Sequence, residues 1–391
     1  GEIFTSIMAG RMLSIYHVDP LVIVPAHVSN DPILRFMPSP HQPALYGPLW
    51  LEICALLAGI TNQLQLTVLL FKGLGLLTHL LNIALIWLLL DKLFPQHRIT
   101  GTLLYAWNPL ILIELVANGQ HEGLVLSLIL LTILLHLQQR RWAQVGALIL
   151  LGLTSSLSFL ALVLIPLYAW FLVQSEATSG HTFWEFCWRL GLGIACFLIP
   201  LLPLWRGGST FLAYTSLLDL QHGLYTPLST ISQPVRFIFA NFVRLFHLPP
   251  TMNPTSSAEL SVKTTALLLF GLLYGAQFSH LRRLTGLQAT SNGLPLLLKS
   301  WQSGMFWALI CIVTPFWPWY TIPVLGLVCL LNYNRSTIAL LLLSCSLLFT
   351  YPLQRVIPPA QSFYIPALTF GIPLIYILIA KSRLIGKDSP S

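Results

Sequence analysis

Residues 66–90 read LTVLLFKGLGLLTHLLNIALIWLLL, and Lys72 is the single charged side chain among them. A run of about 20 apolar residues is long enough to cross the hydrocarbon core of a membrane as an α-helix. The apolar residues do not alternate with polar ones, as they would in a transmembrane β-strand. This run therefore predicts a transmembrane helix, and it sets the class of the whole chain.

The composition of the chain is that of an integral membrane protein. Hydrophobic residues make up 55% of the 391 residues and charged residues only 8%, a balance that soluble domains do not show. We predict an all-α polytopic membrane protein with about eleven or more transmembrane helices and with long outer loops that carry interfacial helices. Four regions follow: a first outer loop at 1–65, a first part of the transmembrane bundle at 66–204, a long outer loop at 205–263, and a second part of the bundle with a basic cytoplasmic tail at 264–391.

The distribution of basic residues predicts the orientation in the membrane. Most of the 20 Lys and Arg residues fall in short connections on one side, which hold Lys92 and Arg98, Arg140 and Arg141, Arg189, Arg282, Arg283 and Lys299, Arg335, and Lys381, Arg383 and Lys387. Cytoplasmic loops carry such an excess, so residues 1–65 are expected on the outer side of a plasma membrane. The basic residues form no patch with interleaved aromatics, so the net charge of +8 does not indicate nucleic-acid binding. The six cysteines include no Cys-x-x-Cys pair and predict neither a disulfide framework nor a thiolate metal site.

Polar and aromatic clusters stand at the ends of apolar runs, on what this orientation makes the outer side. Polar groups near lipid are costly unless they have a partner or a function. The clusters are Gly1-Glu2-Ile3-Phe4, Leu45-Tyr46-Gly47-Pro48-Leu49-Trp50, Trp107-Asn108-Pro109, Asn118-Gly119-Gln120-His121-Glu122 and Phe316-Trp317-Pro318-Trp319-Tyr320. The chain begins without an apolar run before Glu2, so we expect a membrane span to precede this residue.

The order and spacing of these clusters resemble those of bacterial GT-C membrane glycosyltransferases, especially the polyprenyl-phosphate-mannose-dependent mannosyltransferases. Glu2-Ile3-Phe4 through Gly10-Arg11, Tyr46-Gly47-Pro48-Leu49-Trp50, and Trp107-Asn108-Pro109 with Glu114, Asn118-Gly119 and His121 are similar to motifs of that family. Pro318-Trp319-Tyr320 resembles its Pro-Trp-Tyr. The resemblance implies a GT-C-like bundle and the transfer of a hexose, most readily mannose, from a polyprenyl-phosphate donor to a lipid or glycan acceptor at the outer (periplasmic) face.

The chemistry of such a transfer indicates which residue types the site needs. The donor carries its own leaving group, so a carboxylate must take the proton of the acceptor hydroxyl, and cationic groups must receive the departing phosphate. Glu2 matches the catalytic acid of the family, and Glu122 is the alternative base. A solvated Glu2 near the chain end and a helix-capping Glu122 remain open. Arg11 offers a bidentate fork to phosphate, although its side chain is long enough to reach the membrane interface instead.

Substrate contacts are expected from Tyr46, Asn118, His121, Trp319 and Tyr320. Aromatic side chains stack on sugars, but they also mark the membrane interface, so both interpretations of Tyr46, Trp319 and Tyr320 stay open. His121 and Glu122 point about 100° apart on a helix and make a poor metal pair. We expect no cofactor and no divalent metal. No phosphate-binding loop or dinucleotide fingerprint is present.

Two other functions fit part of the pattern. A transporter or lipid flippase would show internal repeats and charged residues deep in broken helices, and no convincing repeat is found. A catalytically inactive GT-C-like protein that binds a lipid-linked sugar is the second alternative. It is favoured by departures from the family pattern, which include Glu2 in place of Asp and the absence of a Lys at Leu153-Thr154-Ser155-Ser156-Leu157.

Overall fold

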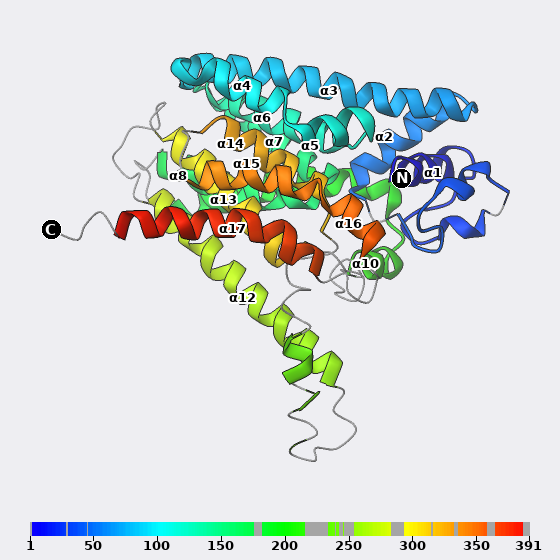
Figure 1. The fold of residues 1–391 in the computed structure, drawn as a ribbon. Coiled ribbons are helices and arrows are strands. Elements are labelled where there is room, and N and C mark those ends of the chain that lie inside the picture. Colours follow the sequence, from blue (N-terminus) through cyan, green and yellow to red (C-terminus); the bar gives the residue numbers. More distant parts are fainter. Residues whose placement is uncertain are drawn as a thin grey trace.

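The computed structural model describes residues 2–28, 30–44, 46–175, 182–215, 234–238, 240–241, 245, 254–282, 293–313, 316–331, 335–357 and 364–385. Helices dominate the described residues, which include no β-strand. Figure 1 shows them as a bundle of roughly parallel and antiparallel helices, from which α12 (Pro254–Arg282) projects. The all-α class expected from the sequence is confirmed.

The first half of the bundle consists of α1 (Glu2–Ser14), α2 (Pro48–Gly59), α3 (Leu64–Leu93), α4 (Arg98–Ala106), α5 (Pro109–Ile111), a π-helix (Leu112–Ala117), α6 (Glu122–His136), α7 (Arg141–Leu157), α8 (Leu164–Ser175) and α9 (Thr182–Leu198). The second half consists of α10 (Gly208–Thr215), α12, α13 (Leu294–Cys311), α14 (Ile322–Cys329), α15 (Arg335–Leu347), α16 (Thr350–Val356) and α17 (Tyr364–Ile385). Short 3₁₀ helices occupy Pro25–His27, Pro32–Phe36, Pro95–His97, Phe159–Val163, Ile199–Leu204 and Pro318–Thr321.

Helix α3 shows why this sequence suits a membrane. Its outward face is as apolar as a protein core, with Leu69, Leu77 and Leu80 exposed. Its polar Asn82 is fully buried, where Nδ2 donates to the Gly123 carbonyl oxygen at 2.8 Å. Lipid cannot satisfy polar groups, so a spanning helix keeps them inside the bundle.

A bend separates α4 from the short α5. The two helices, with the π-helix that follows, form a pair bent by 45° that together has the length and hydropathy of one broken membrane span. Pro109 supplies no N–H to the helix, and the Asn108 side chain accepts hydrogen bonds from the backbone N–H groups of Leu110 and Ile111. Asn108 also donates to Ser344 Oγ at 2.9 Å, which ties this bend to α15. Asn108 thus acts as a helix cap here.

Four described helices are long and apolar enough to cross a membrane, and the bent pair makes five. They lie at Leu64–Leu93, Thr182–Leu204, Leu260–Arg282 and Thr337–Val356. Five shorter apolar helices accompany them, at Pro48–Gly59, Glu122–His136, Phe159–Ser175, Pro318–Cys329 and Tyr364–Ile377. The expected eleven or more spans are therefore not confirmed, because several of the apolar runs fold into helices too short to cross the hydrocarbon.

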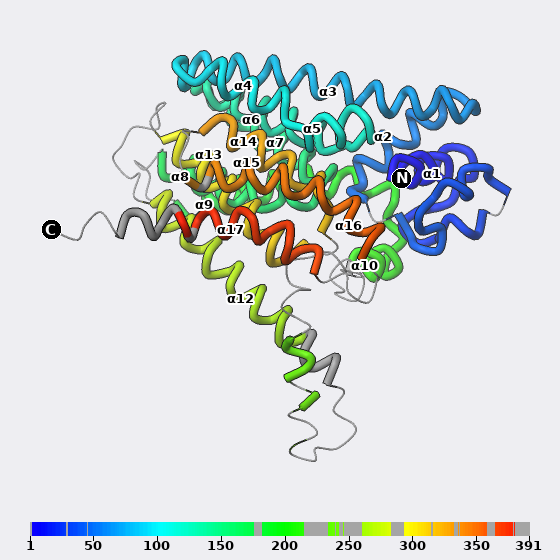
Figure 2. Tube along the Cα trace, in the orientation of Figure 1, coloured from blue at the N-terminus to red at the C-terminus, as the bar shows by residue number. Residues whose placement is uncertain are grey.

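The two long loops expected outside the membrane contain helical structure. In the first, α1 packs on α2 so closely that a Cβ atom on Gly10 would lie 2.2 Å from the Cys54 carbonyl oxygen. In the second, α10 is helical, and α12 begins at Pro254, within the region expected to be loop. Figure 2 follows the chain from α1 to the projecting α12 and back into the bundle through α13. Between α10 and α12, residues 216–253 lie almost wholly outside the residues that the structure describes.

Candidate active site

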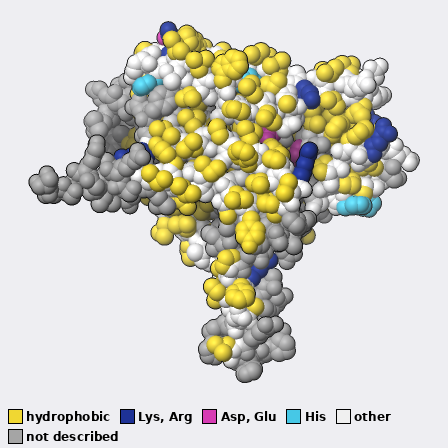
Figure 3. Space-filling view, viewed as in Figure 1, with side chains coloured by type: hydrophobic (Ala, Val, Ile, Leu, Met, Phe, Trp, Pro, Cys, Tyr) yellow, Lys and Arg dark blue, Asp and Glu magenta, His cyan; other side chains and the backbone are white. Residues whose placement is uncertain are grey.

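A cleft of about 600 Å³ opens between the N-terminal helix and the second half of the chain. It is lined by Glu2, Ile3, Phe4, Pro38, Val68, Lys72, Ile113, Ala117, Asn118, Gln120, Trp317, Trp319, Tyr351 and Arg355. Figure 3 shows a largely hydrophobic surface on which a few acidic and basic side chains emerge together, near α5, α16 and the N-terminal helix. Of the residues predicted from sequence, Glu2, Asn118 and Trp319 line this cleft.

Glu2 stands in the first turn of α1, half-buried at the wall of the cleft. Its Oε2 accepts a hydrogen bond from the Tyr46 hydroxyl at 3.3 Å. Burial raises the pKa of Glu2 above its usual value, and the Tyr46 hydroxyl, by favouring the ionised form, opposes this in part. Tyr46 reaches this position because Gly47 leaves room for the Ser156 carbonyl oxygen, 2.3 Å from where a Cβ atom would stand. A carboxylate in this setting is suited to accept a proton.

His121 lies behind Tyr46 and is buried among aromatic rings. It stacks on Trp50 with ring centroids 4.7 Å apart, and it meets the edge of Tyr46 at 5.9 Å. Burial lowers its pKa to about 3, an effect that the Leu157 backbone opposes only partly. His121 is therefore a neutral imidazole that supports the Tyr46 ring, and it is not among the residues that line the cleft.

Glu122 is buried, with 1% of its side chain exposed. Its Oε1 lies 3.6 Å from His121 Nε2, and neither carboxylate oxygen has a hydrogen-bond partner among the described residues. Glu2 and Glu114 are near enough to act on Glu122 electrostatically. The carboxyl groups of Glu2, Glu114 and Glu122 are thus close enough to interact, and of the three only Glu2 lines the cleft.

Glu114 belongs to the π-helix, a form of helix that occurs frequently at functional sites. Its Oε2 accepts a hydrogen bond from Asn118 Nδ2 at 3.0 Å, and its Oε1 accepts one from the Tyr351 hydroxyl. The wider π-helical turn and the positive φ of 67° at Gly119 carry the chain into the start of α6. Glu114 fixes Asn118 and Tyr351, both of which line the cleft.

The opposite wall comes from residues beyond 315. Trp317 and Trp319 stack with ring centroids 5.0 Å apart and planes 5° apart, and both line the cleft. Tyr320 follows them; it packs against Trp319 at 6.0 Å and does not line the cleft, although it is near enough to Glu2 and Glu122 to be affected by their charge. A flat pair of indole rings offers a surface for a sugar ring or a hydrocarbon chain.

Two cationic side chains of the cleft were not assigned a role from sequence. Lys72 extends from α3, and Arg355 extends from α16. Lys72 carried a usable signal, because a charged residue inside an apolar run is a functional candidate by default. Nothing in the sequence singles out Arg355, since only the folded chain brings α16 beside α1.

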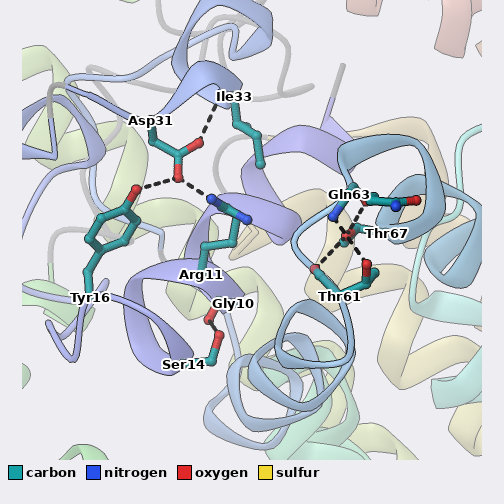
Figure 4. A network of polar contacts seen from close by, with 9 residues as sticks. All are labelled: Gly10, Arg11, Ser14, Tyr16, Asp31, Ile33, Thr61, Gln63 and Thr67. Atoms are coloured by element: carbon teal, nitrogen blue, oxygen red, sulfur yellow. Dashed lines mark hydrogen bonds and ion pairs between the residues drawn. The ribbon is translucent and has the colours of Figure 1, made fainter.

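Arg11 is paired with a buried acid in the structure. Its Nε donates to Asp31 Oδ2 at 2.8 Å, and the same oxygen accepts a hydrogen bond from the Tyr16 hydroxyl at 2.9 Å (Figure 4). The other oxygen of Asp31 accepts from the backbone N–H of Ile33 at 3.0 Å. Arg11 is thus paired with a buried acid and does not line the cleft. Phosphate binding by Arg11 stays a prediction without support from its position.

The N-terminal part of the chain matches a known family. Residues 3–174, from α1 to α8, match the model described as Alpha-(1->6)-mannopyranosyltransferase, N-terminal domain. This segment is similar to the N-terminal domain of that mannosyltransferase family. The match confirms the resemblance read from the sequence motifs. Searches of curated proteins and of solved structures found no match.

The segment that matches the family model and the rest of the chain build the cleft together. The matched segment supplies Lys72, Asn118 and Gln120, and Glu2 comes directly before its first residue. The later helices supply Trp317, Trp319, Tyr351 and Arg355. Among the residues that the structure describes, no group of three or more His, Cys, Asp or Glu side chains could hold a metal ion.

Proposed function

We propose that this protein transfers a mannosyl group from a polyprenyl-phosphate donor to a lipid or glycan acceptor, within the cleft beside Glu2, at the outer face of a bacterial plasma membrane. One observation carries the proposal. A single cleft contains a half-buried carboxylate, two cationic side chains and a stacked pair of tryptophans. The wall opposite these tryptophans is formed mostly by the segment that matches the mannosyltransferase family model.

In the proposed reaction Glu2 is the general base. The oxygen of an acceptor hydroxyl attacks the anomeric carbon of mannose, and the hydroxyl proton passes to the Glu2 carboxylate. The bond between that carbon and the phosphate oxygen breaks, and its electron pair leaves with the polyprenyl phosphate. A positioned base of this kind accelerates transfer by about 10² to 10⁴.

Lys72 and Arg355 are placed to bind the phosphate of the donor. Charge gathers on the leaving phosphate as the bond breaks, and a cation fixed in a partly desolvated cleft stabilises that charge more than it would in water. Their position on the cleft wall supports this role over Arg11, whose charge is already directed at Asp31.

The remaining contacts divide between the sugar and the lipid. Trp317 and Trp319 present a flat apolar wall that suits a sugar face or an isoprene chain, while Asn118 and Gln120 provide hydrogen-bonding groups for hydroxyls. The leaving group is already activated as a phosphate ester, so the mechanism uses neither a cofactor nor a metal. A GT-C-like arrangement, with the cleft at the outer membrane surface, is part of the same proposal.

The test is mannosyl transfer by the purified full-length chain. Radiolabelled mannose on a synthetic polyprenyl phosphate is offered together with membrane glycolipid or glycan extracts, and the product is counted. Glu2→Gln is expected to lower kcat by about 10² to 10⁴ without changing thermal unfolding. Glu52→Gln is the matched control, because Glu52 is a partly buried acid on α2 outside the cleft, and it should keep near wild-type activity.

Two results would contradict the proposal. A loss of less than about tenfold in Glu2→Gln would show that Glu2 is not the base. Failure of a folded wild-type chain to transfer sugar from any polyprenyl-phosphate donor would support a protein that binds lipid-linked sugar without turning it over.

A further inference from the structure

A second cavity lies at the other end of the first half of the bundle. Its volume is about 190 Å³, and Arg141, Gln144, Leu172, Trp188 and Arg189 are among its lining residues. Helix α6 starts at Glu122, beside the first cleft, and ends at His136, a length of about 22 Å for its 15 residues. Since α7 begins directly afterwards at Arg141, the two cavities lie near opposite ends of α6.

The lining of this second cavity is cationic. It contains two guanidinium groups and one carboxylate, that of Glu185, and only 5% of Arg189 is exposed. Glu185 Oε2 lies 3.4 Å from Arg189 Nη2 and also accepts a hydrogen bond from Trp188 Nε1 at 2.6 Å. One carboxylate therefore serves two donors, and the charge of Arg141 is left without an opposite charge in the cavity wall.

The placement of Arg141 indicates an anion. It is the first residue of α7, where the free backbone N–H groups already carry partial positive charge. A cationic side chain at this end is electrostatically unfavourable for the helix, whereas an anion would interact well with both the helix end and the guanidinium. Gln144, one turn further along, adds an amide to the same wall.

Aromatic residues around the cavity indicate the depth at which it lies. Trp142 and Trp184, in the first turns of α7 and α9, are exposed, as is Phe183 beside Trp184. Exposed tryptophans concentrate at the headgroup level of a membrane. Helix α9 is itself a candidate span with most of its surface outside the protein core. The opening of the cavity is thus set where phospholipid headgroups would lie.

We propose that this cavity binds the phosphate of an anionic membrane phospholipid, at the end of α6 that lies away from the cleft. Arg141 and Arg189 bind the phosphate, Gln144 binds the headgroup, and the acyl chains lie along the exposed apolar surface of α9. The site is separate from the transfer reaction, and its lining residues are not shared with the cleft.

Native mass spectrometry of the full chain, released from detergent, tests the proposal. Phosphatidylglycerol, phosphatidylcholine and inorganic phosphate are titrated separately, and bound adducts are counted. We expect a phosphatidylglycerol adduct in preference to phosphatidylcholine. Arg141→Ala should weaken it about fivefold, the effect expected for one basic residue at a membrane surface. Glu185→Gln should strengthen it, since the amide keeps an acceptor for Trp188 but removes the competing charge.

Arg140→Ala is the matched control. It removes the same charge from the preceding residue, which is exposed as Arg141 is but does not line the cavity, so binding should change less than about twofold. Equal losses in Arg140→Ala and Arg141→Ala would overturn the proposal in favour of diffuse attraction. Equal binding of the two lipids would also overturn it, as would binding of inorganic phosphate as tight as that of phosphatidylglycerol.

Discussion

Replacing Arg11 distinguishes a structural role for this side chain from donor binding. The structure predicts that Arg11→Met destabilises the fold and leaves the affinity for donor unchanged. Asp31 is 3% exposed and would lose the partner at 2.8 Å that compensates its charge. Removing one member of a buried ion pair costs about 3 to 5 kcal/mol. The Arg11 side chain is 13% exposed, and Asp31 would still accept hydrogen bonds from the Tyr16 hydroxyl and the Ile33 N–H. We therefore expect Arg11→Met to lower the free energy of unfolding by about 2 to 4 kcal/mol.

The assay has two readouts on the same preparation: thermal unfolding in detergent and the KM for the polyprenyl-phosphate donor. Arg11→Met should unfold at a lower temperature with KM within about twofold of wild type. Lys72→Met should show the reverse, with a raised KM and little change in unfolding, since Lys72 lines the cleft. The double variant Arg11→Met/Asp31→Leu should recover much of the lost stability, because replacing both partners removes the uncompensated charge.

One pattern of results would show instead that Arg11 binds the donor. If Arg11→Met unfolds like wild type but its KM for donor rises about tenfold or more, then Arg11 binds the phosphate during turnover. The ion pair with Asp31 would then belong only to the protein without substrate.

Two further predictions concern pH and packing. The raised pKa of Glu2 predicts that kcat/KM falls as the pH drops through a value above 4.5, the ordinary pKa of a glutamate. Tyr46→Phe removes a hydrogen bond to the ionised carboxylate, so it should move this fall in kcat/KM to higher pH. If the fall stays in place or moves to lower pH, the result argues against Glu2 as the base. Gly75→Ala should cost about 1 to 3 kcal/mol in thermal or denaturant unfolding, because its Cβ would lie 2.1 Å from the Leu115 carbonyl oxygen. Gly73→Ala is the control, because no atom lies within 4 Å of the Cβ it would add, and it should be neutral or stabilise α3 by up to about 1 kcal/mol. Equal effects at Gly73 and Gly75 would show that the close contact with Leu115 does not determine the cost.

The sequence predicted helices well where one apolar run is long and uninterrupted. The run at 66–90 became α3, which extends to Leu64 and Leu93 and stops before Pro95. The next apolar run along the chain, residues 99–116, is broken, because Asn108 caps a new helix start at Pro109. Hydropathy does not register such a break, nor does it show that other apolar runs fold into helices too short to cross the membrane.

The site was predictable only as far as its motifs are local in the chain. Glu2, Asn118 and Trp319 were proposed from motif order, and the structure places all three on one cleft, while their roles stay predictions. Tyr46, His121, Glu122 and Tyr320 stand behind that wall, a depth that a one-dimensional pattern does not give. Arg355 enters through the packing of α16, far along the chain from α1.

The division of the cleft between two halves of the chain has an evolutionary consequence. The carboxylate and the lysine come from the first half, whereas the paired tryptophans and the arginine come from residues beyond 315. Under the proposed mechanism, changes in the second half can therefore alter which sugar or lipid the cleft accommodates without replacing Glu2, the proposed proton acceptor. The same division makes the two halves natural units for exchange: a chimaera that keeps residues 1–175 and takes its later helices from a related protein would inherit its reaction from one parent and its substrate preference from the other.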